Sequence, residues 1–305
     1  MKKVTILLSV YNGAKYLREQ LVSILNQKNV SIRIIIRDDC STDNSVNLIN
    51  QFIKDTSCPI KLIKGDNLGF AESFSALLKE AYIYHPDSDY YAFADQDDVW
   101  MEDKLISAIT KISEIEDATL PCGYCSNCTL VDSNLNYIRL MHNRKIEISK
   151  ERALIQNIAT GCTMLFNYTA LKYYVENKPA KILVHDYFMY LICIYLGRFI
   201  YDSESHINYR QHSNNQIGSK SWPCRMKRRI TRFGASDGYF ERHNKAFLES
   251  YKHLLAIEDI LRISYLCNYR NSLFSKLALL FDGKYKYDNF EFNVFMCLKI
   301  LLGKL

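Results

Sequence analysis

Glycine and proline are scarce in this chain, with 11 Gly and 5 Pro among 305 residues. That scarcity excludes a collagen-like chain, and a content of 48% hydrophobic and 24% charged residues excludes a disordered one. The composition indicates a folded globular protein. Since the chain exceeds a typical domain of roughly 100–200 residues, we expect one large α/β core with an extension.

The sequence also lacks a hydrophobic run long enough to cross a bilayer. The apolar stretch from Tyr187 to Gly197 falls well short of the ~20 residues that a membrane-spanning helix needs. The N-terminal residues Met1-Lys2-Lys3-Val4 lead into a strand-like run without a signal-peptide cleavage site. We therefore expect a cytoplasmic protein whose ten cysteines are reduced.

A complete set of cysteine ligands for a metal cluster is missing as well. Cys122, Cys125 and Cys128 form a Cys-x-x-Cys-x-x-Cys run, but no fourth Cys or His follows at the usual zinc or iron–sulfur spacing. The run favours a strand whose small thiol side chains face inward.

Motifs of several nucleotide-binding classes are absent. The turn after the first strand-like run reads Tyr11-Asn12-Gly13-Ala14-Lys15, which is not the Gly-x-Gly-x-x-Gly of a dinucleotide-binding fold, and no phosphate-binding loop occurs. The Gly-rich, Arg-containing first loop of sugar-nucleotide pyrophosphorylases is also missing. A basic segment from Lys220 to Arg232 is too local to indicate a nucleic-acid partner.

What the chain does have is an alternation of apolar, β-branched runs with helix-period segments, which predicts parallel strands joined by crossover helices. Polar clusters follow the strands, and ligands of open α/β sheets bind beyond the carboxyl ends of strands. The predicted strands are Val4 to Val10, Ser31 to Arg37, Ile60 to Ile63 and Tyr90 to Ala94, and the helices between them are Lys15 to Asn26, one carrying Val46, Ile49 and Ile53, and one through Phe74, Leu77, Leu78 and Ala81.

The second half of the chain gives weaker signals. Cys128 to Val131 and Cys162 to Phe166 are strand-like, and Tyr187 to Leu196 is helix-like. From residue 221 to residue 305, apolar residues recur at helical spacing, which predicts a helical C-terminal extension.

Three aspartates, Asp95, Asp97 and Asp98, directly follow the strand that ends at Ala94. Their carboxylates repel one another unless a cation neutralises them. Since strand side chains alternate, Asp95 and Asp97 are expected on one side, and hard carboxylate oxygens suit Mg²⁺ or Mn²⁺. The alternative is an acidic turn that caps the helix after Glu102.

Five blocks in order carry a resemblance to a known family: Thr5-Ile6-Leu7-Leu8-Ser9-Val10-Tyr11-Asn12-Gly13, Arg37-Asp38-Asp39-Cys40-Ser41-Thr42-Asp43, Asp95-Gln96-Asp97-Asp98-Val99-Trp100, His185-Asp186-Tyr187 and Tyr209-Arg210-Gln211-His212-Ser213-Asn214-Asn215. They resemble the family 2 glycosyltransferases, in the rhamnosyltransferase-like branch of cell-wall and capsule polysaccharide synthesis. Cys40 stands where the family often has Gly. The resemblance covers about residues 4 to 220, and its specificity lies in the order of the blocks.

The resemblance implies a GT-A fold, an α/β nucleotide-diphospho-sugar transferase fold with a mixed, mostly parallel central sheet. It divides the chain into a nucleotide-sugar-binding half (1–120), an acceptor-binding half (121–220) and the helical extension (221–305). It implies sugar transfer with inversion from a nucleoside-diphosphate sugar to a saccharide or lipid-linked saccharide acceptor. The first expected donor is dTDP-L-rhamnose, while UDP-hexoses and a non-catalytic nucleotide-sugar-binding module stay open as alternatives.

The same resemblance assigns roles residue by residue. Asp39 would hydrogen-bond the pyrimidine base, and Asp186 would act as the catalytic base; the alternative for Asp186 is a charge that stabilises a helix N-terminus. His212 would complete the metal shell or touch phosphate, and its alternative is a structural histidine. The predicted nucleotide-binding residues are Tyr11, Asn12, Asp39, Asn67 and Asp95, and the predicted metal ligands are Asp95, Asp97 and His212.

A last expectation concerns membranes. The basic segment from Lys220 to Arg232 precedes aromatic-rich, amphipathic segments, a combination that suits peripheral attachment to an anionic lipid surface through residues 220–305. The alternative is a solvated basic face beside helices that pack on the core or on a dimer partner.

Overall fold

The computed structural model describes residues 1–179, 183–212, 238–286 and 290–305. The chain forms two compact units. The first comprises Met1–Lys145 and Ala159–Gln211, and the second comprises Ile146–Ile158 and His212–Leu305.

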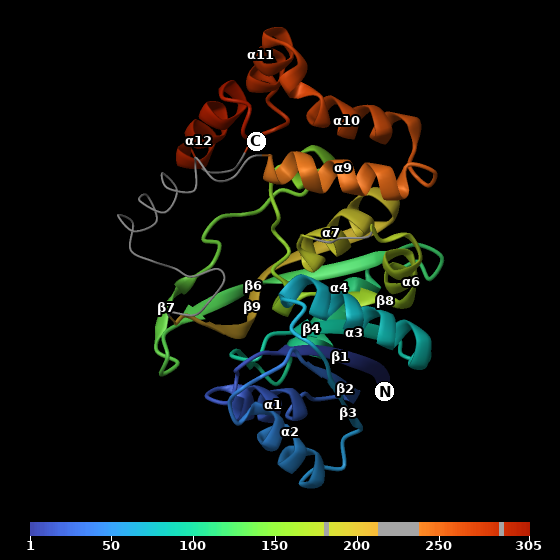
Figure 1. The fold of residues 1–305 in the computed structure, drawn as a ribbon, viewed down its shortest axis with the longest axis vertical. Coiled ribbons are helices and arrows are strands. Elements are labelled where there is room, and N and C mark those ends of the chain that lie inside the picture. Colours follow the sequence, from blue (N-terminus) through green and yellow to red (C-terminus); the bar gives the residue numbers. More distant parts are fainter. Residues whose placement is uncertain (180–182, 213–237, 287–289) are drawn as a thin grey trace. The chain divides into compact units, whose positions relative to one another are not determined.

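One nine-stranded mixed sheet organises the described part of the first unit (Figure 1). Its strand order is β3-β2-β1-β4-β8-β6-β9-β5, with β7 paired to β6. The strands β1 to β4 are parallel, β8 runs antiparallel between β4 and β6, and β9 is parallel to β6. The strands are β1 Lys2–Val10, β2 Val30–Asp38, β3 Ile60–Lys64, β4 Tyr90–Ala94, β5 Val99–Trp100, β6 Cys122–Val131, β7 Tyr137–Leu140, β8 Leu165–Asn167 and β9 Arg198–Arg210.

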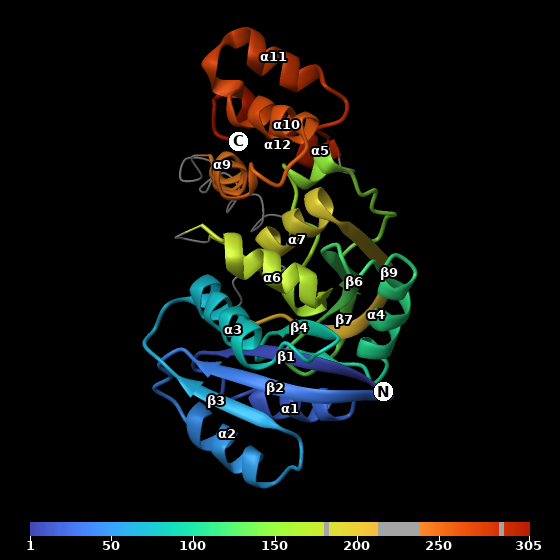
Figure 2. The ribbon, with the colours of Figure 1, turned by 90° about the vertical axis from the view of Figure 1, so that its right-hand side faces the viewer.

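Helices cover both faces of this sheet (Figure 2). On one face lie α1 (Leu17–Leu25), α2 (Ser45–Lys54) and α4 (Lys104–Ser113), whose apolar residues join alternate residues of β1 in one core cluster. The other face carries α3 (Phe70–Tyr84), α6 (Tyr168–Asn177) and α7 (His185–Leu196). The period of two along β1 explains this division, because Leu8 enters the first core while Ser9 meets Ser73 of α3 at 2.6 Å.

The predicted elements of the first hundred residues are confirmed with small shifts of their ends. The strand Tyr90–Ala94 has the predicted bounds, and the first helix begins two residues later than predicted, at Leu17. The strand predicted from Cys162 to Phe166 is partly wrong, because Gly161–Thr163 forms a 3-10 turn and the strand begins at Leu165. No prediction covered β9, which pairs with β6 along most of its length.

The cysteine run lies in a buried strand, as predicted. Cys122, Cys125 and Cys128 are buried in β6 and form no disulfide. Cys122 and Cys128 belong to the core cluster that contains α1 and α4, whereas Cys125, an odd number of residues away from each, faces the other side. The three thiols therefore do not form a single metal site.

The described residues of the second unit are helical, which confirms the predicted C-terminal extension (Figure 1). Side-chain contacts join residues 146–158 to the rest of this unit. Lys150 Nζ lies 2.6 Å from the Asp259 carboxylate, Arg262 Nε donates to Glu151 at 2.7 Å, and Asn244 Nδ2 donates to the Leu154 carbonyl at 2.7 Å. The helices are α5 Lys150–Ala153, α9 Tyr239–Tyr251, α10 Ile257–Cys267, the 3-10 helix Tyr269–Asn271, α11 Leu273–Phe281 and α12 Phe290–Leu301.

Two expectations from the sequence concern membrane-spanning helices and the basic segment after residue 219. Within those ranges, every helix is too short or too polar to cross a membrane. The whole basic segment from Lys220 to Arg232, and the start of the predicted extension at residue 221, lie outside the described residues.

Candidate active site

The carboxyl ends of four parallel strands meet at one edge of the sheet. Val10 is paired with Asp38, Asp38 is paired with Lys64, and Leu8 is paired with Ala94. The loops that follow β1, β2, β3 and β4 are therefore neighbours, as the positions of the polar clusters in the sequence predicted.

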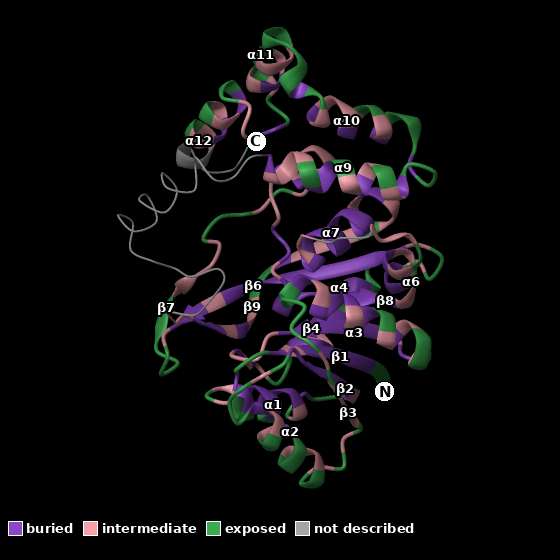
Figure 3. Ribbon diagram, viewed as in Figure 1, coloured by how far each residue is buried: buried purple, intermediate pink, exposed green. Residues whose placement is uncertain are grey.

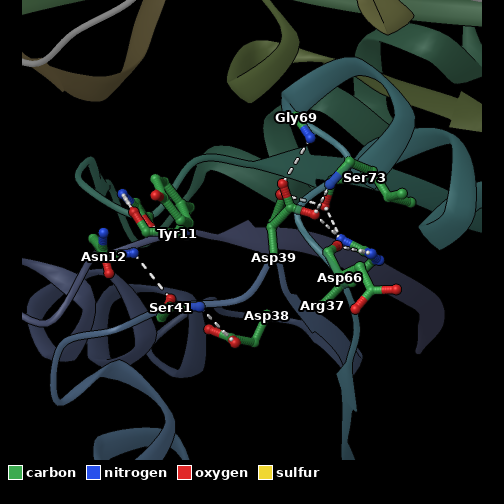
Figure 4. A network of polar contacts seen from close by, with 12 residues as sticks. Tyr11, Asn12, Arg37, Asp38, Asp39, Ser41, Asp66, Gly69 and Ser73 are labelled. Atoms are coloured by element: carbon green, nitrogen blue, oxygen red, sulfur yellow. Dashed lines mark hydrogen bonds and ion pairs between the residues drawn. The ribbon is translucent and has the colours of Figure 1, made fainter.

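Asn12 joins the first of these loops to the second (Figure 4). Its amide N–H donates to Ser41 Oγ at 2.9 Å, and its side-chain oxygen accepts from the Thr42 amide at 2.8 Å. The neighbouring Tyr11 is 48% exposed, and its amide donates to Gln96 Oε1 at 2.8 Å. The loops after β1, β2 and β4 thus form one hydrogen-bonded rim with an exposed aromatic ring.

The turn after β2 has left-handed backbone at Cys40, where φ is 70°. Glycine adopts this region at little cost, whereas most side chains are disfavoured there. This geometry gives a physical reason for the glycine often found at the position in the family that the sequence resembles.

Asp39 is buried, and its carboxylate is held by the protein (Figure 4). One oxygen accepts from the Leu68 amide and the other from the Gly69 amide, both at 2.9 Å, and Arg37 forms an ion pair with the same group. Arg37 also donates to the Asp66 carbonyl at 2.8 Å. Asp39 therefore fixes the loop after β3. A contact with a pyrimidine base would have to share or displace these partners, so that role stays a prediction, as does the role of the exposed Asn67 in the same loop.

The acidic segment after β4 is a turn, because the strand ends at Ala94. The expectation that Asp95 and Asp97 face one side rested on strand alternation, which does not apply in a turn. The group that the geometry offers to an ion is instead Asp95, Asp98 and Cys162, whose possible ligand atoms lie within 4.8 Å of one another. Whether Asp97 joins them as a ligand stays a prediction.

The carboxylates of this segment raise one another's pKa. Desolvation, followed by the charges of Asp97 and Asp186, raises the pKa of Asp95 to about 7. Desolvation and the charges of Asp97 and Asp95 also raise the pKa of Asp98. Asp186 is therefore close enough to Asp95 to act on it, although the two residues are far apart in the sequence. A cation at this point would relieve the repulsion.

The residues fit a hard divalent cation. Among the described residues, Asp98 Oδ2 is buried without a hydrogen-bond partner, while its Oδ1 accepts from the Arg210 amide at 3.1 Å. Burial raises the pKa of the Cys162 thiol, and hard cations prefer carboxylate oxygens to sulfur, so Cys162 is the weakest of the three candidate ligands. Carboxylate oxygens without a thiolate favour Mg²⁺ or Mn²⁺ over a softer metal.

Asp186 lies in the first turn of α7 and is nearly buried. Its Oδ2 accepts from the Gly161 amide at 2.9 Å. A Cβ at Gly161 would lie 3.3 Å from that oxygen and 3.2 Å from His185 Nε2, so the tight approach favours glycine there. The helix dipole and this hydrogen bond orient the carboxylate.

His185 precedes Asp186 and is surrounded by aromatic rings. It stacks on Phe74 with ring centroids 3.9 Å apart and meets Phe93 edge-on. Burial lowers the pKa of His185 to about 3, so the imidazole is neutral. Neither ring nitrogen has a hydrogen-bond partner in the described part of the chain.

Two buried cations lie around the acidic turn. Arg210, at the end of β9, donates to the Asp97 carbonyl at 2.9 Å and to the Ser133 carbonyl at 2.6 Å, and forms an ion pair with Glu19. Lys104 lies 3.7 Å above the Trp100 ring, and burial lowers its pKa to about 8 against the opposing effects of Cys162 and Asp98. Arg210 thus holds the backbone of the turn that carries the aspartates.

The predicted ligand His212 is half-buried and begins the second unit. Its position relative to Asp95 and Asp97 is therefore not described, and its role stays a prediction.

Sequence reasoning missed several contributors to this site. Asp98 was named in the cluster without a separate role, and Arg210 lay inside a recognised block without one. For Cys162 and Gly161 no sequence signal existed, because only the folded chain brings the 3-10 turn beside Asp98 and Asp186.

Comparison with known proteins gives consistent matches. The sequence profile of Glycosyl transferase family 2 matches residues 5–174. The chain is 31% identical over 237 residues to the dTDP-rhamnosyl transferase RfbG of Shigella flexneri, covering 72% of this chain and 77% of that protein. It is also 29% identical over 229 residues to an uncharacterized glycosyltransferase, alr2836, of a Nostoc species, covering 72% of this chain and 68% of that protein.

Solved structures agree on the fold. S. aureus TarS (residues 1–349) in complex with UDP-GlcNAc superposes with a TM-score of 0.57 at 16% identity, covering 93% of this chain and 78% of that one. The mannosyltransferase PcManGT of Pyrobaculum calidifontis, in complex with GDP-Man and Mn²⁺, gives a TM-score of 0.53 at 17% identity, covering 99% of this chain and 85% of that one. The fold is the GT-A fold that the sequence predicted.

Proposed function

Because the chain belongs to glycosyltransferase family 2, we propose that it is an inverting transferase that moves L-rhamnose from dTDP-L-rhamnose to a saccharide acceptor. The choice of donor is supported by the similarity to RfbG, a protein named as a dTDP-rhamnosyl transferase. The acceptor that we propose is a lipid-linked saccharide in surface polysaccharide synthesis. Relatives named for teichuronic and teichoic acid synthesis, which match 40% and 32% of this chain, support that setting.

The observation that carries the proposal of catalysis is the convergence of Asp186 with Asp95 and Asp98. Asp186 accepts from the Gly161 amide at 2.9 Å, and the possible ligand atoms of the next residue, Cys162, and of Asp95 and Asp98 lie within 4.8 Å of one another. An acid from the start of α7 therefore lies close to the acidic turn after β4. A module that only binds a nucleotide sugar would not require this additional carboxylate. In our proposal Asp186 accepts the proton of the acceptor hydroxyl while that oxygen attacks the anomeric carbon.

A divalent cation is part of the proposal. Asp95 and the unpartnered oxygen of Asp98 would hold Mg²⁺ or Mn²⁺, and Asp97 and His212 are further proposed ligands. When bound, such an ion acts as a Lewis acid that stabilises the negative charge of the leaving diphosphate. PcManGT, with the same fold, is described in complex with GDP-Man and Mn²⁺.

The nucleotide would lie along the rim formed by the strand ends. Tyr11 offers an exposed ring, and Asn12 and Asn67 lie on exposed stretches of the first and third loops. We propose that these residues and Asp39 shape the nucleotide pocket within the donor half, residues 1–120, and that residues 121–220 shape the acceptor side. In this arrangement Asp39 acts through the loop it holds as well as through any contact with the base.

A donor screen tests this function. Purified protein with Mn²⁺ and a saccharide acceptor should consume dTDP-L-rhamnose and release dTDP, as measured by chromatography. Transfer with a UDP-hexose only would reject the rhamnosyl donor and keep the proposed chemistry. If thermal shift detects donor binding and no donor turns over, the chain is a nucleotide-sugar-binding module.

A further inference from the structure

Helix α11 exposes an apolar stripe on a surface of the second unit. Leu273, Phe274, Leu277 and Phe281 have exposed fractions between 38% and 81%, and at 100° per residue they occupy one face of the helix. Figure 3 shows exposed and half-buried residues on this helix. The same helix buries Leu279, so the stripe is additional to the side that packs inward.

The neighbouring helices repeat this pattern. On α10, Ile257 and Leu261 are exposed one turn apart, and on α12 Val294, Leu298 and Leu301 are exposed, followed by Leu302 directly after the helix. Helix α11 is fixed to α12, because Lys276 Nζ donates to the Leu301 carbonyl at 3.1 Å. Large exposed apolar side chains at helical spacing are a feature of interaction surfaces, whereas single exposed ones need no explanation.

Charge indicates which partner fits this stripe. The two segments of the second unit contain 18 Lys and Arg but 10 Asp and Glu, a net charge of +8, although the whole chain carries +6. Lys284 and Lys286 are exposed immediately after α11. Apolar Leu and Phe on one face of a helix, with exposed lysines directly after it in a segment of chain of net positive charge, are typical of helices that lie in the interface of an anionic membrane.

We propose that α11 is a membrane-docking helix, whose stripe of Leu273, Phe274, Leu277 and Phe281 enters the headgroup region of an anionic lipid surface. A second copy of the chain fits less well, because pairing would bring two units of net charge +8 together. Docking goes beyond the proposed function, since it needs neither donor nor acceptor.

The test is flotation with vesicles made of phosphatidylglycerol and phosphatidylcholine in equal parts, and with vesicles of phosphatidylcholine alone. The full chain should float with the anionic vesicles and stay behind with the neutral ones. The double variant Phe274→Ser/Phe281→Ser should bind at least about tenfold more weakly, because it lacks the two aromatic rings that enter the lipid. The double variant Lys284→Glu/Lys286→Glu should also bind the vesicles more weakly. A higher salt concentration should weaken the binding of the parent protein to the anionic vesicles.

The matched control is Ile83→Ser, which removes an exposed apolar residue of α3 in the first unit and should float like the parent. Circular dichroism checks that each variant is folded. Flotation of the double variant at the parent level, or no flotation of the parent, would overturn the proposal. So would a change in oligomeric state of the double variant without vesicle binding, which would assign the stripe to a second copy.

The result of the flotation test is independent of the result of the transfer assay. Asp186→Asn should float like the parent, and the double variant should transfer sugar to a water-soluble acceptor at the parental rate. Failure of transfer with normal flotation therefore rejects only the proposed function, and the reverse result rejects only the docking helix.

Discussion

Asp98 has two oxygens in different surroundings. One accepts the Arg210 amide, and the other, within the described residues, is buried without a donor. A buried carboxylate oxygen without a partner is costly, so an ion at this point would gain affinity from relief of that cost. The acidic run in the sequence predicted a metal site but not which oxygens face it, because strand alternation ends at Ala94.

Removal of metal should therefore abolish transfer. We expect EDTA to stop the reaction and added Mn²⁺ to restore it, because the leaving diphosphate loses its charge stabilisation. Asp98→Asn should weaken Mn²⁺ binding measured by electron paramagnetic resonance. The control is Cys162→Ala, which should keep Mn²⁺ affinity because a hard cation is held by carboxylate oxygens rather than by sulfur. Full activity in excess EDTA would contradict the metal role.

Asp186→Asn separates chemistry from binding. The variant keeps the size of the side chain and an acceptor for the Gly161 amide, but it removes the base, which typically contributes 10²–10⁴-fold in rate. We expect single-turnover transfer to fall by about that factor while nucleotide affinity changes little. Asp202→Asn, an equally buried aspartate on β9, is the control and should keep its rate per folded molecule. Near-normal transfer by folded Asp186→Asn would remove this residue from the mechanism.

At the scale of elements, the strands of the first half were predictable because parallel, two-sided burial leaves continuous apolar runs such as Tyr90 to Ala94. Strand β9 was not, because Asp202, Ser203, Glu204 and Ser205 interrupt its apolar pattern. Its pairing with β6 has register shifts at Ser126, Asn127 and Thr129. That pairing is a tertiary effect, which local periodicity does not contain.

Arg210 fastens the end of β9 to the acidic turn, so its loss should destabilise the fold. Arg210→Met leaves the buried carbonyls of Asp97 and Ser133 without their donor, and we expect a loss of about 2–4 kcal/mol in the free energy of unfolding. The exposed partner Glu19 contributes little to this figure. Urea unfolding measures the loss. Arg198→Met, at the half-exposed start of the same strand, should change stability by less than about 0.5 kcal/mol.

At the scale of the whole molecule, the sequence predicted a GT-A domain with a helical extension, and both are confirmed. It did not predict that residues 146–158 belong with the extension, because the contacts of Lys150 and Leu154 join segments about a hundred residues apart. The proposed division at residues 120 and 220 stays a prediction.

Each unit buries a histidine whose protonation favours the unfolded chain in acid, whereas the raised pKa values of Asp95 and Asp98 act in the opposite direction. Burial lowers the pKa of His185 to about 3 and that of His243 to about 4, below the usual value of about 6.5. At these two positions the unfolded chain therefore binds more protons between these values, and the histidines' contribution to the free energy of unfolding falls as the pH drops from about 7 toward 4. Each histidine accounts for about 2 kcal/mol between pH 7 and pH 5.

Urea unfolding at pH 7 and pH 5 measures this dependence. His243→Asn should raise the free energy of unfolding at pH 5 relative to that at pH 7 by about the share of one histidine, compared with the parent. His253→Asn, at an exposed position, should show the same difference between the two pH values as the parent. An equal difference in all three proteins would contradict the assignment.

The thiols buried in β6 report local unfolding of the central sheet, because they become accessible only when the sheet opens. Burial raises the pKa of Cys122, Cys125 and Cys128, so an alkylating reagent reaches and modifies them only when the sheet separates. Cys40 is exposed and should react at once, which provides an internal standard for the reagent. Pulsed alkylation followed by mass spectrometry would then measure how fast β6 separates from β9, without any introduced label. Donor binding should lower the alkylation rate of these thiols.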